Sequence, residues 1–210
     1  SIFSAKRGRA WPLPCRGRGD YRIRHGFGYT TFEHEEGGIA TELRMAVAPE
    51  DPVRCAALTI RNLSGRRRPL SVTGYVEWVL GDLRSRSAMH IVTTADPRGE
   101  SLFARNAYSI DFPGRVAFFA VAFPGGGTAG ATSSMGRGAG EAGQAFTCDR
   151  AEFIGRNGDL SRPAALSRAS LSGRSGAGLD PCAALQTRFE AGPGEECVIV
   201  FLLGAAADME

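Results

Sequence analysis

Short apolar segments rich in β-branched and aromatic residues recur from end to end of this 210-residue chain, and sustained helical periodicity is hard to find. Residues 115–123 (RVAFFAVAF) are nearly continuous apolar sequence, which is typical of a central strand covered on both faces. Residues 70–80 alternate instead, which places Val76 and Trp78 on one face and Tyr75 on the other. The pattern predicts an all-β protein of two packed antiparallel sheets.

Two pairs of strand segments, each joined by turn residues, predict hairpins: 53–61 with 70–80, and 183–191 with 197–203. The second connection contains Gly192-Pro193-Gly194, in which proline and glycine supply turn dihedrals. Helix is expected only for a turn or two around residues 163–169.

Composition suits one globular unit, because 43% of the residues are hydrophobic and 22% are charged. We expect a single domain over residues 1–210, with the glycine-rich stretch 125–143 as a mobile surface loop inside it. The longest apolar stretch near the end, 198–203, is too short to span a bilayer, and no charged-then-apolar leader opens the chain. We therefore expect a soluble fragment without a targeting signal of its own.

The net charge of +3 is small, and the cluster Arg66–Arg68 lacks interleaved aromatic residues. A nucleic-acid partner is therefore not expected. The five cysteines are widely and irregularly spaced and form no CxxC pair, which argues against a zinc site and a complete disulfide framework. We therefore expect reduced thiols in a cytoplasmic setting. Cys182 is expected to be a small buried side chain. No metal and no cofactor is expected.

Three histidines are candidates for metal binding or acid–base chemistry. His34 lies among Glu33, Glu35 and Glu36, but strand alternation puts it on the opposite face from Glu33 and Glu35. This pattern favours a structural or surface histidine over a catalytic one. His90 is expected to be partly buried in a strand. His25 carries no pattern of its own.

Two polar segments, 148–166 and 178–186, run into apolar strands, and polar loops held by a sheet often carry function. By residue type, a pair of carboxylates among four acidic residues would suit glycoside hydrolysis: Asp149, Glu152, Asp159 and Asp180. Capping or ion pairing is the simpler interpretation for Asp149 and Asp180. Trp11 and Trp78 are candidates for stacking on sugar rings, although a place in the core or an interface suits each better.

Six segments in order resemble the N-terminal β-sandwich of glycoside hydrolase family 94: HGFGYTTFEHEEGGI, LTIRNLSGRRRPLSVTGYVEWVLG, LFARNAYSIDF, DRAEFIGRNGDLSRPAAL, GLDPCAAL and PGEECVIVFLLG. The resemblance covers nearly the whole chain. That family includes cellobiose and chitobiose phosphorylases and the C-terminal region of cyclic β-1,2-glucan synthases. The segments EWVLG and FIGRNG are most similar to the synthase branch.

The resemblance implies a supersandwich related in shape to galactose mutarotase, which precedes an (α/α)6 barrel in the parent protein. In the family the barrel holds the catalytic aspartate, and phosphate attacks the anomeric carbon. No catalytic residue is therefore assigned here, and no enzymatic activity is expected of this fragment. The parent is expected to be a glycoside phosphorylase or glycosyltransferase acting on β-glucans, on the cytoplasmic side and associated with the inner membrane.

The implied partners are the barrel of the same parent chain, a β-glucan oligosaccharide and a second copy in a homodimer. The residues expected at the mouth of the active site are Arg150, Arg156, Asn157 and Asp159. Arg156 and Asn157 can hydrogen-bond sugar hydroxyls, while Gly155 and Gly158 let the backbone approach closely. The same loop is also suited to capping a strand end and pinning the sheet to the next domain.

Two other functions stay open. The chain can be a free-standing carbohydrate-binding module, in which Trp11 and Trp78 stack on the sugar. It can also be an enzyme like aldose mutarotase, an idea that the poor pairing of histidine with glutamate weakens.

Overall fold

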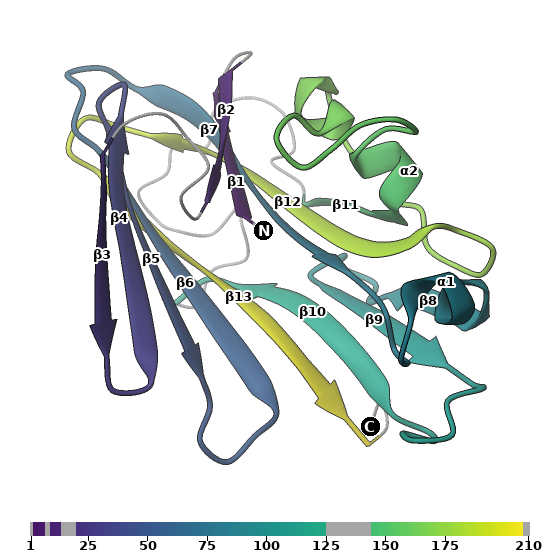
Figure 1. Ribbon diagram of the computed structural model, residues 1–210. Helices are drawn as coiled ribbons and strands as arrows, with labels where there is room; N and C mark the ends of the chain where they lie inside the picture. The colour runs from purple at the N-terminus through teal and green to yellow at the C-terminus, as the bar shows by residue number, and fades with distance from the viewer. Residues whose placement is uncertain (1, 7–8, 14–19, 125–143, 208–210) are drawn as a thin grey trace.

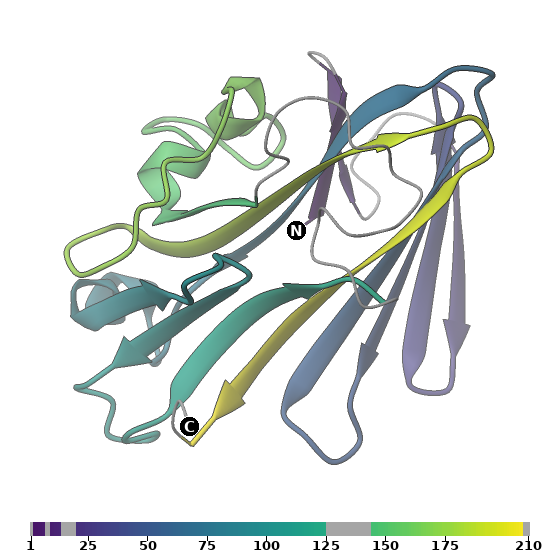
Figure 2. The same ribbon diagram turned by 180° about the vertical axis from the view of Figure 1, so that it is seen from behind.

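The computed structural model describes residues 2–6, 9–13, 20–124 and 144–207, and the side chains of 20–124 and 144–207. The described strands form two antiparallel sheets, which lie as layers one above the other (Figures 1 and 2). The expected all-β, two-sheet antiparallel architecture is confirmed. The glycine-rich loop expected at 125–143 lies outside the described residues.

The larger sheet contains, in spatial order, β3 (Tyr21–Gly26), β4 (Tyr29–Glu36), β5 (Ile39–Val47), β6 (Val53–Asn62), β13 (Glu196–Ala206), β10 (Val116–Ala122), β9 (Ser101–Asn106) and β8 (Ile91–Ala95). The smaller sheet contains β11 (Ala145–Asp149), β12 (Pro181–Ala191), β7 (Arg68–Glu77), β1 (Ile2–Lys6) and β2 (Arg9–Leu13). β10 lies between β9 and β13, which confirms the predicted central strand. One face is only partly covered, since Phe118 and Ala120 are half-buried and Ala122 is exposed.

The main core fills the space between the two sheets, where inward-facing residues of β7 and β12 meet those of the larger sheet. The rings of Phe119 and Phe201 stack there with centroids 5.6 Å apart. Gly74 faces this pair, and a Cβ atom at Gly74 would lie 2.5 Å from the Phe201 ring. Glycine therefore occurs inside this strand because the two aromatic rings occupy the space of a side chain.

A second cluster covers the outer face of the smaller sheet, beneath a layer of short helices that Figure 1 shows beside β11 and β12. Tyr75 stacks on Phe153 with ring centroids 4.5 Å apart. Tyr75 thus lies on the opposite face of β7 from Trp78, which belongs to the main core. This confirms the alternation read from residues 70–80 and shows that β7 is buried on both faces.

Within the described residues, four short helical segments connect the strands: α1 (Arg84–Ser87), the 3-10 turn η1 (Ala88–His90), α2 (Arg150–Phe153) and the 3-10 turn η2 (Ala164–Ser167). η2 confirms the helical turn expected around 163–169. α1, η1 and α2 lie outside that range and were missed. For α2 a signal was present, because Asp149 is a favourable N-cap residue and its side chain accepts a hydrogen bond from the Ala151 amide at 3.0 Å. None of the described helices is long and apolar enough to cross a membrane.

Both predicted hairpins are wrong. β6 pairs with β5 and β13 in the larger sheet, whereas β7 pairs with β12 and β1 in the smaller one. β12 and β13 are divided between the sheets in the same way. Each turn therefore crosses from one layer to the other. The turn residues reverse the chain as predicted, but the long-range pairing of strands decides which sheet receives the next strand.

Asn62 ties these two crossings together. Its side-chain amide donates to the carbonyl oxygens of Ala191 (2.8 Å), Gly192 (2.9 Å) and Arg66 (2.8 Å), and its Oδ1 accepts from the backbone and hydroxyl of Ser64. The backbone N–H of Asn62 donates to a further carbonyl in the second turn, that of Glu195, at 3.0 Å. Asn62 has no exposed surface, so these bonds replace water completely.

Candidate functional site

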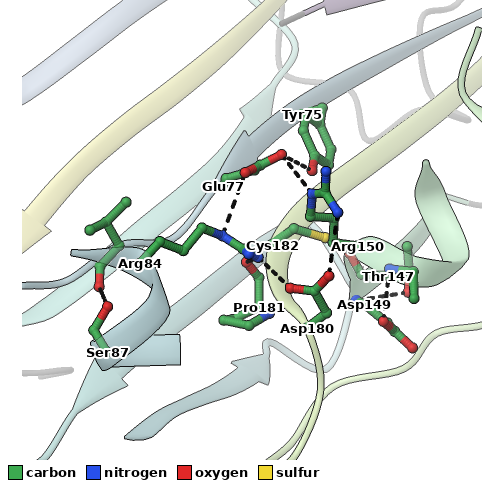
Figure 3. A network of polar contacts seen from close by, with 12 residues as sticks. Tyr75, Glu77, Arg84, Ser87, Thr147, Asp149, Arg150, Asp180, Pro181 and Cys182 are labelled. Atoms are coloured by element: carbon green, nitrogen blue, oxygen red, sulfur yellow. Dashed lines mark hydrogen bonds and ion pairs between the residues drawn. The ribbon is translucent and has the colours of Figure 1, made fainter. Parts of the chain in front are cut away.

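Four charged side chains converge at one end of the smaller sheet (Figure 3). Glu77 ends β7, Arg84 begins α1, Arg150 begins α2 and Asp180 precedes β12. Arg150 Nε lies 3.0 Å from Glu77 Oε1, and Arg150 Nη1 lies 3.5 Å from Asp180 Oδ2. Arg84 Nε lies 3.5 Å from Glu77 Oε2, and Arg84 Nη2 also pairs with Asp180 Oδ1. Each arginine therefore bridges the same two carboxylates, and we call these four residues the charge ring.

The charge ring rests on the buried outer face of β7. The Tyr75 hydroxyl donates to Glu77 Oε1 at 2.8 Å, and burial, followed by the charge of nearby groups and the bond to Glu77, raises the pKa of Tyr75. The hydrogen bond to Glu77 raises the pKa of Arg150. The ring side chains are about one third exposed, between 30% and 35%. The arrangement fixes the start of α2 against the ends of β7 and β12, and Arg150 stays cationic.

Backbone and capping bonds hold the same junction. The Arg150 amide donates to the Asp180 carbonyl at 2.7 Å. Asp149 caps α2 and its other oxygen pairs with Arg174 Nη1 at 2.9 Å. The capping and ion-paired roles expected for Asp149 and Asp180 are thereby confirmed. Both carboxylates are engaged in these contacts.

Glu152 anchors the polar segment that follows α2. Its side chain is 5% exposed and accepts hydrogen bonds from Thr147 Oγ1 (2.7 Å), Ser172 N (3.0 Å) and Ser172 Oγ (2.5 Å). Burial alone would raise the pKa of this carboxyl, but the bonds from Ser172 and Thr147 and the charge of Arg168 outweigh it and lower the pKa. Glu152 therefore links Thr147 in β11 to Ser172, at the two ends of this segment.

The loop after α2 is a tight turn that carries exposed polar side chains. Gly155 has φ +96°, and a Cβ atom at Gly158 would lie 2.1 Å from the Ile154 carbonyl oxygen. Both positions thus need glycine for the loop's own path. Arg156 and Asn157 are exposed between them. Asp159 Oδ1 accepts a hydrogen bond from the Ser161 amide at 2.6 Å, which closes the turn.

The residues predicted for an active-site mouth therefore divide into two groups. Arg150 is tied into the charge ring, while Arg156, Asn157 and Asp159 lie exposed on the loop of residues 155–160. We call this exposed stretch the 155–160 loop. Sequence reasoning missed Glu77 and Arg84, because their partners are distant along the chain and no local pattern marks them.

The two tryptophans differ in what the structure says of them. Trp78 is 4% exposed within the main core, so its indole offers no open face to a sugar ring. Trp11 lies on β2, and its side chain is outside the described residues.

His34 is buried, stacked on Tyr21 with ring centroids 4.2 Å apart, and its Nδ1 lies 3.1 Å from the Asp20 carbonyl oxygen. Glu33 points to Arg22 and Arg24 instead, at 3.7 and 3.0 Å. His34 Nε2 also lies 3.6 Å from Glu36 Oε2, so a pairing of histidine with glutamate that the sequence did not predict is present. The burial and ring stacking of His34 are those of a structural side chain. Within the described ranges, no three His, Cys, Asp or Glu side chains are grouped to hold a metal ion.

Four described cysteines have free thiols: Cys55, Cys148, Cys182 and Cys197. Cys148 and Cys182 have no exposed surface. Burial raises the pKa of Cys148 to about 11 and also raises that of Cys182, so neither thiol is activated as a nucleophile. The expectation that Cys182 is a small buried side chain is confirmed.

Known proteins are similar to this chain in sequence and in fold. The sequence profile described as "Glycosyl hydrolase 94, supersandwich domain" matches residues 6–210. The chain is 39% identical over 187 residues to the cyclic beta-(1,2)-glucan synthase NdvB of Rhizobium meliloti (strain 1021), and 28% identical over 187 residues to the solabiose phosphorylase of Paenibacillus borealis. Both alignments cover 89% of this chain but only 6% and 22% of those relatives.

A solved structure of a human-microbiome protein assigned as a kojibiose phosphorylase has the same fold. Its TM-score is 0.52 at 8% sequence identity, over 98% of this chain and 21% of that one. At this identity the likeness concerns the fold alone.

Proposed function

The chain belongs to glycoside hydrolase family 94 as its supersandwich domain, and we propose that it is a non-catalytic, carbohydrate-associated part of a glucan-processing enzyme. In this role it supports the catalytic (α/α)6 barrel of the parent chain and shapes the mouth of its active site. The parent acts as a glycoside phosphorylase or glycosyltransferase on a β-glucan. The relatives named above, a glucan synthase and a phosphorylase, support this proposal.

The observation that carries the proposal is the fixed base beneath the 155–160 loop. The charge ring holds the start of α2, Glu152 holds its middle, and Phe153 packs on Tyr75. A loop held in this way presents Arg156 and Asn157 without a large loss of conformational entropy on binding. An arginine fork and an amide are suited to the vicinal hydroxyls of a sugar.

The test is a kinetic comparison in the full-length enzyme, with β-1,2-gluco-oligosaccharide as the substrate. Arg156→Ala and Asn157→Ala are each expected to raise the KM for the glucan by about five- to tenfold, equivalent to one hydrogen bond to a charged or neutral group. Arg66→Ala is the matched control, because Arg66 is also an exposed loop arginine, and it should leave KM unchanged.

Unchanged KM in both loop variants would overturn the role at the mouth. A loss of kcat with an unchanged KM would also contradict it, because an interaction with bound substrate in the ground state acts first on KM. Circular dichroism of each variant establishes that the sheets are intact before its kinetics are interpreted.

A further inference from the structure

Most exposed large apolar side chains of the described residues lie in two segments, 79–92 and 106–112. They are Val79, Leu83, Met89, Val92, Tyr108, Ile110 and Phe112, and Ile110 is 92% exposed. Contiguous exposed apolar surface in a water-soluble fold marks an interaction site more often than single exposed residues do. We call these two segments together the Leu80–Phe112 surface.

Two contacts join the segments into one surface. Asn106 Nδ2 donates to the Leu80 carbonyl at 2.8 Å, and the rings of His90 and Tyr108 lie 4.5 Å apart. Leu80 has φ +42°, a left-handed conformation that is strained for leucine and is held by this hydrogen bond. These contacts therefore hold the two segments in fixed positions relative to each other.

A groove of about 450 Å³ opens in this surface, with Leu80, Phe112, Ala117, Pro52 and Ala205 in its walls. Arg115 is the one charged residue among its described lining residues. The hollow on the larger sheet around Glu33, Glu42 and Glu196 is lined by many charged groups instead. An apolar groove with so few charges has the composition of an interface core and not of a water-facing site.

The position of the groove indicates its occupant. Ala205 in its wall lies one residue before the end of β13, so the last described strand ends beside the groove. The greater part of both sequence relatives, 94% and 78% of their lengths, falls outside the matched region, since the alignments cover 6% and 22%. A domain attached beside the groove would meet it at high effective concentration.

We propose that the Leu80–Phe112 surface is the docking face for a further domain of the same polypeptide, which inserts apolar side chains into the groove. This rests on the proposed function, in which the sandwich supports a catalytic barrel. It adds the face and the residues through which that support acts. Phe112 and Ile110 are the central contacts, with Tyr108 and His90 at the edge.

Photocrosslinking in the full-length protein tests the docking face. p-Benzoylphenylalanine in place of Tyr108 is expected to crosslink to a peptide of another domain within the same chain, identified by mass spectrometry after digestion. The control site is Phe27, which is fully exposed on the turn between β3 and β4, at the opposite edge of the larger sheet. It should form no such crosslink. Crosslinks between two copies, or none from position 108, would overturn the proposal.

A second measurement separates this proposal from the role of the 155–160 loop. Phe112→Ser is expected to lower the thermal midpoint of the full-length protein by several degrees, whereas Phe27→Ser leaves it unchanged. If position 108 crosslinks within the chain but the Arg156 and Asn157 variants keep their KM, the docking face is supported and the role of the 155–160 loop at the active-site mouth is refuted. If KM rises but no crosslink forms and Phe112→Ser has no effect, docking alone fails.

Discussion

Asn62 is a single side chain on which both sheet-crossing turns depend. Replacement by alanine removes one hydrogen-bond donor from the Ala191 carbonyl and leaves the Gly192 carbonyl with only the Glu195 amide, in a place that water does not reach. Asn62→Ala is expected to lower the free energy of unfolding by about 2–4 kcal/mol. Urea denaturation measures the change. Asn157→Ala, in an exposed loop, is the control and should change it by less than about 0.5 kcal/mol.

Glu152 gives stability a specific dependence on pH. Its folded pKa is below the ordinary value of 4.5, so its contribution is complete above about pH 4.5 and is lost as the pH falls through the lower, folded value. Glu152→Gln is expected to lower stability at pH 7 by about 1–3 kcal/mol. The gap between the two proteins in urea should narrow toward pH 3, and a gap independent of pH would refute this account of the carboxylate.

The middle of β7 shows how one element is adapted to the opposite sheet. Gly74→Ala puts a methyl group against the Phe119 and Phe201 rings, which are packed on all sides and cannot move away cheaply. We expect a loss of about 1–3 kcal/mol in the free energy of unfolding, measured by thermal or urea denaturation. Gly65→Ala has open space around it and should be neutral or slightly stabilising.

The charge ring is an interaction between elements, and a double-mutant cycle measures it. For Arg84→Ala and Asp180→Ala, a coupling of about 0.5–1 kcal/mol is expected, because both partners are one third exposed and each also serves the other half of the ring. The more exposed pair Arg86 and Asp82 should couple by no more than about 0.3–0.5 kcal/mol. Equal coupling in both pairs would show that the ring adds nothing beyond an ordinary surface ion pair.

Strands and their faces were predictable from local sequence, whereas their partners were not. Alternation in residues 70–80 placed Tyr75 and Trp78 on opposite faces correctly, since side-chain direction follows the strand itself. The same turn residues serve a hairpin and a crossing between sheets equally well. Which of the two forms depends on pairings such as β6 with β13, whose residues are more than a hundred positions apart.

The ordered motifs taken together identified the family, but single motifs did not reveal how the site is built. Arg150 was recognised from its segment, yet its partner Glu77 lies 73 residues away, and Arg84 lies 96 residues from Asp180. Only the folded sheet brings these groups together. The loop glycines were predictable as such, but Gly158 proved to accommodate the chain's own Ile154 carbonyl.

We propose that this sandwich serves a catalytic domain and does no chemistry itself. The most direct measurement is release of glucose 1-phosphate from β-1,2-gluco-oligosaccharides and phosphate, by the purified 210-residue chain and by the full-length protein at equal molar concentration. We expect product from the full-length protein and none above the buffer blank from the chain alone. Turnover by the isolated chain would contradict it.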